Sequence, residues 1–156
     1  MSQKQRSIFL EKVPTLKSEK CKVLSSIFSD GDLRFMDNIR HNDKDSKYLI
    51  LNAGSWIKNT KGCVEFAQEN NLDFELVQGL PYQEMLIKLS TSKGLIFLPT
   101  GGDTCPRIVI EAKLLGCDLK LNDNVQHKDE DWFSGSQENC YNYLTNRAAT
   151  FWEFYE

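Results

Sequence analysis

The sequence predicts an α/β fold, with a doubly wound, mostly parallel sheet and helices on both of its faces. From residue 47 onward, short apolar runs alternate with amphipathic helical patterns. Glycine or proline separates most of these segments, as is typical of turns. A strand, a helix and a second strand joined in this way form a right-handed parallel unit. With 156 residues, 40% of them hydrophobic, the chain can bury the core that such a single domain needs.

Four strands and four helices are expected in this pattern. The strands are short apolar runs, at residues 48–53, 74–77, 95–98 and 117–121. The helices have apolar residues at helical spacing, at residues 60–70, 82–92, 106–115 and 137–154. Thr60 is a candidate N-cap, Pro106 suits the first position of the third helix, and Gly116 ends that helix. We expect the fourth strand to lie at a sheet edge.

The chain before residue 47 is less regular. Residues 21–28 can supply one more strand, 30–32 a turn and 42–46 a polar connector. We therefore predict a single Rossmann-like domain over residues 1–156, made of a lead-in at 1–46, a motif-bearing core at 47–125 and a terminal helix at 136–155.

Composition excludes several classes of partner. A net charge of −3 creates no strong field that would favour nucleic acid or an anionic membrane as a partner. No apolar run is long enough for a transmembrane segment, and the first residues lack an apolar signal region, so we expect a cytoplasmic protein. Five widely spaced cysteines favour reduced thiols. His41 and His127 lack metal-ligand spacing, so no metal is expected. Neither the P-loop nor the Gly-x-Gly-x-x-Gly pattern occurs, which excludes kinase-like and classical dinucleotide sites.

The most informative stretch is the glycine turn between the third strand and the third helix. Gly101 and Gly102 allow the backbone to bend sharply or to be approached closely. The helix that follows presents free N–H groups and a positive dipole end to an anion. Asp103 and Glu111 frame this place, and a ribose attached to a bound phosphate would reach the depth of Glu111. The alternative is that Asp103 caps the loop and Glu111 faces solvent.

Three cations lie close to the expected ligand edge of the sheet. Lys58 and Lys61 follow the first strand and can neutralise a diphosphate, although surface charge is the alternative. Arg107 opposes the helix dipole unless an anion binds beside it or it pairs with Asp103. A nucleophile and base formed by Cys105 and His127 is a further, weaker alternative.

Two motifs together resemble one enzyme family. Residues 103–117 resemble the carboxylate-x7-Glu-Ala motif of retaining GT-B glycosyltransferases, the group 1 or GT4-like families, and they follow a similar strand that ends in Leu-Pro-Thr. Residues 51–62 resemble the strand–Gly-Arg–Lys-Gly loop of the same family. The order and spacing of the two motifs also match, over residues 47–125. The resemblance implies a nucleotide-sugar donor domain, the C-terminal half of a GT-B enzyme.

The resemblance also implies roles for individual residues. Glu111 would bind the ribose, Asp103 the transferred sugar or the reacting region, and Lys61 the diphosphate, in metal-independent chemistry that needs no cofactor beside the donor. Asp103 and Glu111 are thus the candidate catalytic residues. The candidate donor-binding residues are Gly54, Ser55, Lys58, Lys61, Gly101, Gly102, Thr104, Cys105, Arg107 and Glu111.

The chain departs from the family at three positions. Asp103 replaces the commoner glutamate, Ser55 stands where the family has arginine, and Pro106 removes one backbone donor. The length leaves room for the donor half only. We therefore expect a glycosyltransferase, or its donor-binding half: either a fragment, a truncated reading frame, or one subunit of a split enzyme whose separate acceptor-domain subunit supplies the other half. The alternatives are a non-catalytic nucleotide- or phosphate-binding module and a protein-interaction domain on the same fold.

Overall fold

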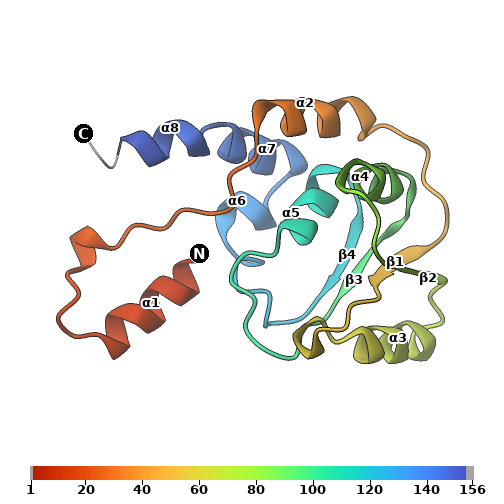
Figure 1. The fold of residues 1–156 in the computed structure, drawn as a ribbon, viewed down its shortest axis with the longest axis horizontal. Coiled ribbons are helices and arrows are strands. Elements are labelled where there is room, and N and C mark those ends of the chain that lie inside the picture. The colour runs from red at the N-terminus through yellow and green to blue at the C-terminus, as the bar shows by residue number, and fades with distance from the viewer. Residues whose placement is uncertain (1, 154–156) are drawn as a thin grey trace.

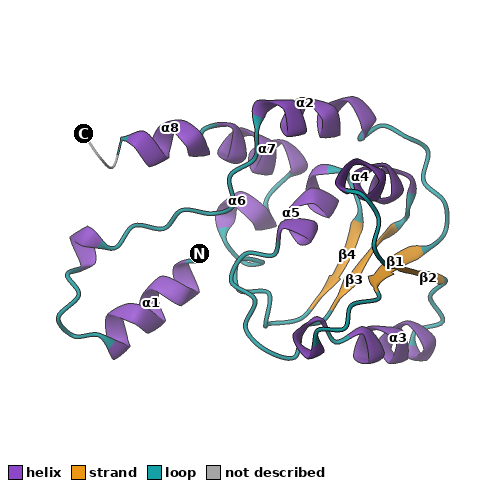
Figure 2. Cartoon of the chain, viewed as in Figure 1, coloured by secondary structure: helices purple, strands orange, loops and turns teal. Residues whose placement is uncertain are grey.

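Four parallel strands form the centre of the molecule in a computed structural model that describes residues 2–153. They are β1 (Tyr48–Leu51), β2 (Phe74–Val77), β3 (Gly94–Phe97) and β4 (Asp118–Leu121), in the order β2-β1-β3-β4 (Figure 2). Every pair of neighbouring strands is parallel. The predicted α/β class and parallel sheet are confirmed, and β4 lies at an edge as expected.

Helices cover both faces of this sheet. Helix α3 (Thr60–Glu69) lies on one face, and α4 (Tyr82–Thr91) and α5 (Arg107–Leu114) lie on the other (Figure 1). Helices α2 (Asp30–Ile39) and α7 (Gln137–Thr145) pack against α5 from outside. From β1 the chain first winds outward to β2 and then crosses back to β3 and β4. The winding direction therefore reverses between β1 and β3, which is where open sheets of this class bind ligands.

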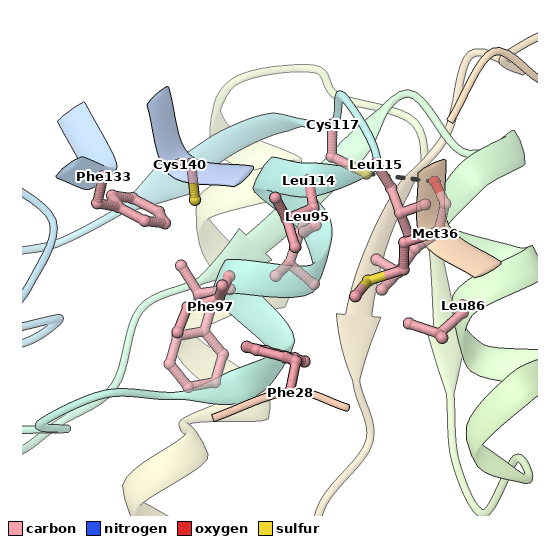
Figure 3. Packing of buried hydrophobic residues seen from close by; sticks show 14 of the residues in the cluster. Phe28, Met36, Leu86, Leu95, Phe97, Leu114, Leu115, Cys117, Phe133 and Cys140 are labelled. Carbon is pink, nitrogen blue, oxygen red and sulfur yellow. Dashed lines mark hydrogen bonds between the residues drawn. The ribbon is translucent and has the colours of Figure 1, made fainter. Parts of the chain in front are cut away.

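The alternation of side chains along the strands produces two cores. Tyr48 and Ile50 pack with Cys63 and Ala67 of α3, whereas Leu49 lies in the cluster on the opposite face. In this larger cluster, strand residues meet side chains of three helices (Figure 3), namely Met36 of α2, Leu86 of α4 and Leu114 of α5.

The lead-in differs from its prediction. It contains α1 (Gln3–Lys12), the short 3-10 helix η1 (Ser18–Lys20) and α2, and the turn expected at 30–32 is the first turn of α2. Ser29 caps α2 by accepting a hydrogen bond from the Asp32 amide at 3.0 Å. The prediction of a strand at 21–28 is wrong. This stretch is extended but runs beside the loop before α5, where the Ser26 hydroxyl donates to the Cys105 carbonyl oxygen at 3.3 Å.

The polar connector at 42–46 joins two helix ends. Lys44 Nζ donates to the carbonyl oxygens of Ser90, Ser92 and Leu115, at 3.1, 3.3 and 2.9 Å. These carbonyls belong to the last turns of α4 and α5, where no further helical N–H follows to bind them. A lysine in a polar stretch thus ties together the two helices that cover one face of the sheet.

The terminal helix expected at 137–154 is two helices. Helix α7 ends at Thr145, Asn146 intervenes, and α8 (Arg147–Trp152) follows; residue 154 lies outside the described residues. Cys140 and Leu144 of α7 are buried, but α8 buries no residue and extends away from the sheet (Figure 1). A short helix, α6 (Asp131–Ser134), precedes them. None of the helices in residues 2–153 has the length and apolar character that a bilayer crossing requires.

The termini of α3, α4 and α5 agree with expectation to within one or two residues. Asn59, not Thr60, caps α3, with its side chain accepting from the Gly62 amide at 3.2 Å. Pro106 is the N-cap of α5 and not its first residue. Gly116 ends α5 with a φ of +70°, a conformation that favours glycine.

Candidate functional site

The loops after β1 and β3 meet where the winding of the sheet reverses. The first contains the 3-10 helix η2 (Trp56–Lys58). The Thr100 amide donates to the Ile57 carbonyl oxygen at 3.1 Å, and Asn59 Nδ2 donates to the Leu98 carbonyl oxygen at 2.8 Å. The two loops are therefore held as one surface at the carboxyl ends of the strands.

An ion pair crosses this junction. Lys58 Nζ lies 2.8 Å from Asp103 Oδ2, and the two side chains are 30% and 17% exposed. Lys58 Nζ also lies 5.0 Å from the centroid of the Phe97 ring at the end of β3. The structure thus brings together two of the predicted site residues, one from each loop.

Lys61 takes no part in this pair. Its side chain is 89% exposed, and its Nζ lies 3.6 Å from Glu65 Oε1, one turn along α3. Asn59 separates the two lysines, because its left-handed backbone (φ 53°) ends η2 before α3 begins. The cation that reaches the candidate site is therefore Lys58.

The loop after β4 supports Asp103 from the other side. The Asp103 amide donates to the Asn124 carbonyl oxygen at 2.8 Å, and the Gln126 amide donates to the Asp103 carbonyl oxygen at 3.0 Å. The side-chain amides of Asn122 and Asn124 both donate to the Pro99 carbonyl oxygen, at 2.9 and 2.8 Å. Three loops thus converge at this edge, and the carboxylate of Asp103 lies in a fixed backbone frame.

Of the two reasons predicted for the glycine pair, only close approach is found, and only at Gly102. Neither is among the described glycines with a positive φ, so no left-handed bend requires them. A Cβ on Gly102 would lie 2.6 Å from Gln126 Nε2, which is a close approach. A Cβ on Gly101 would make only ordinary contacts, and one on exposed Gly54 would have no atom within 4 Å.

Glu111 lies in a second cluster, on the α4 side of α5. It is 4% exposed, and its Oε1 lies 3.5 Å from Arg107 Nε and has no hydrogen-bond partner among residues 2–153. Arg107 is held by other groups as well. It donates to the Tyr82 hydroxyl at 3.3 Å and to the Ile27 carbonyl oxygen at 2.9 Å. Glu111 is thus buried and does not face solvent, and Arg107 pairs with it and not with Asp103.

Burial dominates the electrostatics of this second cluster. It raises the pKa of Glu111, while Tyr82 and Arg107 beside the carboxylate oppose the rise. Burial, followed by the charge of Glu111, raises the pKa of Tyr82 to about 12. The cluster therefore holds a carboxylate acceptor, a neutral hydroxyl and a guanidinium within reach of one another.

The other sequence predictions have mixed outcomes. Ser55 is exposed next to η2, and Thr104 and Cys105 are half-buried in the loop before α5. Cys105 and His127 are not hydrogen-bonded to each other: Cys105 Sγ contacts the Ser26 hydroxyl at 3.7 Å, whereas neither ring nitrogen of His127 has a partner among residues 2–153. The nucleophile and base pair is therefore not formed. In the same part of the chain, no group of three potential ligands is placed to hold a metal ion.

Two residues of the site were not anticipated. Tyr82 is the first residue of α4, and nothing in its sequence context distinguishes it from a surface tyrosine. Trp56 stands in η2, 77% exposed at the junction of the loops. A lone tryptophan in a polar loop directly after a strand was the signal that could have identified it.

No protein-family model, curated protein or solved structure matches this chain.

Proposed function

We propose that the chain binds a nucleoside-diphosphate sugar at the carboxyl edge of its sheet, as the donor half of a glycosyltransferase. The observation that carries the proposal is the Lys58–Asp103 pair, which joins the loops after β1 and β3 at the switch in winding. A cation beside a helix amino end suits a diphosphate, and a carboxylate suits the hydroxyls of a sugar.

In this proposal the bound diphosphate replaces Asp103 as the ion-pair partner of Lys58. Lys58 would turn toward the phosphates at the amino end of α5 and would free the carboxylate oxygens of Asp103 for sugar hydroxyls. Glu111 would accept hydrogen bonds from the ribose through Oε1, which forms an ion pair with Arg107 but has no hydrogen-bond partner in the described residues. Burial raises the pKa of Glu111, and Arg107 beside the carboxylate opposes this rise in favour of the ionised form that this role needs.

Catalysis would consist mainly of charge stabilisation. The bond between the sugar C1 and the diphosphate oxygen breaks, the acceptor oxygen forms the new bond to C1, and the acceptor proton passes to a base or to solvent. The negative charge that develops on the leaving diphosphate would be stabilised by Lys58 and by the dipole of α5. The acceptor would be held by a separate domain or subunit.

A non-catalytic nucleotide-binding module on the same fold is the second candidate. Two observations favour it: Ser55 replaces the arginine of the family, and Asp103 and Glu111 are both engaged by cations of the chain itself. Supplying an acceptor half in trans separates the candidates. Release of nucleoside diphosphate would support the enzyme, and binding without turnover would support the module.

Calorimetry with UDP- and GDP-sugars tests the binding itself. We expect Glu111→Gln to weaken the affinity by about 5- to 150-fold, since charged hydrogen bonds contribute ~1–3 kcal/mol. Lys58→Met should lower the affinity for nucleoside diphosphates more than the affinity for nucleosides. Lys61→Met is the matched control, because its exposed side chain lies outside the site, and it should bind as the wild type does. Equal affinities for the wild type and both site variants would refute the site.

A further inference from the structure

Trp56 occupies the surface where the loops after β1 and β3 meet. Its side chain is 77% exposed, the largest exposed fraction among the large apolar side chains of residues 2–153. An indole in water at this position leaves a wide apolar face unburied. The indole therefore lies outside the core and is accessible to a ligand.

The backbone holds Trp56 firmly in this exposed position. The Trp56 carbonyl oxygen accepts hydrogen bonds from the Asn59 amide at 3.1 Å and from the Thr100 hydroxyl at 3.3 Å. The two residues that follow in η2 point elsewhere: Ile57 is half-buried, and Lys58 pairs with Asp103. The indole is thus directed outward by a 3-10 turn whose other side chains are already engaged.

Gly101 leaves space directly beside the indole. A Cβ built on Gly101 would lie 3.9 Å from Trp56 Cη2 and 3.7 Å from Ile57 Cδ1, which are ordinary contacts. Gly101 is not among the described glycines with a positive φ. The fold would therefore accept a side chain at this position, and its absence leaves the backbone open to a ligand that lies against Trp56.

We propose that Trp56, Gly101 and Asp103 form a platform for a pyranose ring, the sugar of the donor. The apolar C–H face of the ring would pack on the indole and on the bare backbone of Gly101, while Asp103 would accept hydrogen bonds from the hydroxyls at the ring edge. The inference rests on the proposed function, because Lys58 then places the diphosphate between this platform and the ribose at Glu111. A nucleobase could also stack on an indole, but it lies beyond the ribose, on the far side of the diphosphate from Asp103.

Calorimetry with paired ligands tests the platform: UDP against UDP-glucose, and GDP against GDP-mannose. We expect Trp56→Ala to lower the affinity for the sugar-bearing ligand by about tenfold, in the range of an aromatic stacking contact. The affinities for UDP and GDP should be unchanged. Trp56→Phe should retain part of the affinity. Trp152→Ala, which removes a 66% exposed tryptophan from α8, is the matched control and should bind as the wild type does.

A second variant approaches the platform from its other side. Gly101→Ala adds one methyl group at van der Waals distance from the indole, so the fold should be retained. The affinity for the sugar-bearing ligand should again be lowered, and the affinity for UDP should not. Circular dichroism and the melting temperature check the folding of both variants. An equal loss of UDP and UDP-glucose would overturn the platform, because the indole would then contact the nucleotide. An unchanged affinity in both variants would overturn it as well.

A separate measurement covers failure of the proposed function. If the wild type binds none of the four nucleotides, the donor site is refuted, and methyl glycosides at millimolar concentration are titrated while the indole N–H signals are followed by NMR. Trp56→Phe assigns the signal of Trp56. A shift of the Trp56 signal, with the signals of Trp132 and Trp152 unchanged, would support a sugar platform that is independent of nucleotide. The absence of such a shift would overturn the platform too.

Discussion

Stability at low pH should depend on His127. The ring is fully buried, stacked on Trp132 with centroids 5.4 Å apart and in edge contact with Phe133 at 4.5 Å. Burial lowers its pKa to about 4, although the charge of Asp103 opposes this change. In the unfolded chain the same group titrates near its ordinary pKa of about 6.5.

Whether the free energy of unfolding rises or falls with pH depends on which state of the chain binds the proton at His127. Between these two pKa values the unfolded chain holds a proton on His127 and the folded chain does not, so the free energy of unfolding falls as the pH falls. Each pKa unit corresponds to about 1.4 kcal/mol. Relative to pH 7, the free energy of unfolding should therefore be lower by about 2 kcal/mol at pH 5 and by about 3 kcal/mol below pH 4. Glu111 acts in the opposite direction, because its raised pKa makes the folded state bind its proton more tightly.

Comparison with His127→Phe isolates this contribution. Neither imidazole nitrogen has a hydrogen-bond partner in the described residues, so an apolar ring of similar shape leaves no polar group unpaired. Urea unfolding followed by circular dichroism at pH 7 and pH 5 gives the free energy for each protein. The wild type should lose about 2 kcal/mol more than His127→Phe on acidification, and His41→Gln, which removes an exposed histidine, is the control. Equal losses for the wild type and His127→Phe would refute the buried neutral imidazole.

Two further predictions concern the packing at the amino ends of β3 and β4. Lys44→Met should lower the free energy of unfolding by about 1–3 kcal/mol, because the ends of α4 and α5 lose a shared charged donor; urea unfolding measures it, with exposed Lys61→Met as the control. Gly94→Ala should cost about 1–3 kcal/mol or more, because its Cβ would overlap the Asp118 carbonyl oxygen at the start of β4. Gly54→Ala has no atom within 4 Å of the added carbon and should melt as the wild type does; equal melting temperatures for the two alanine variants would contradict this account.

Local patterns were sufficient to predict the core between residues 48 and 121. All four strands and the three helices between them lie where apolar periodicity and glycine or proline boundaries placed them, to within one or two residues. This agreement has a physical cause: side chains that alternate between two buried faces, or recur at helical spacing, record the backbone period directly in the sequence.

The lead-in and the carboxyl-terminal helices were predicted less well. Apolar residues at 21–28 suggested a strand, but a strand also requires an unpaired sheet edge beside it, and this stretch packs against the loop before α5. The helical pattern through residue 154 carried no glycine or proline to mark the break at Asn146. Local composition contains neither the position of a sheet edge nor the extent of the surface that a helix can cover.

For the candidate site, sequence reasoning pointed to one edge of the sheet and the loops along it, but tertiary packing decided which side chains pair there. Lys58 and Lys61 are equivalent candidates in the sequence, yet only Lys58 reaches Asp103, because the left-handed turn at Asn59 separates them. Likewise, Arg107 joins buried Glu111 and Tyr82, residues that the chain brings together only by folding α4 against α5. The succession of strands and helices along the chain follows from local patterns, whereas ion pairs and the exposure of Trp56 depend on distances between loops that lie far apart in the chain.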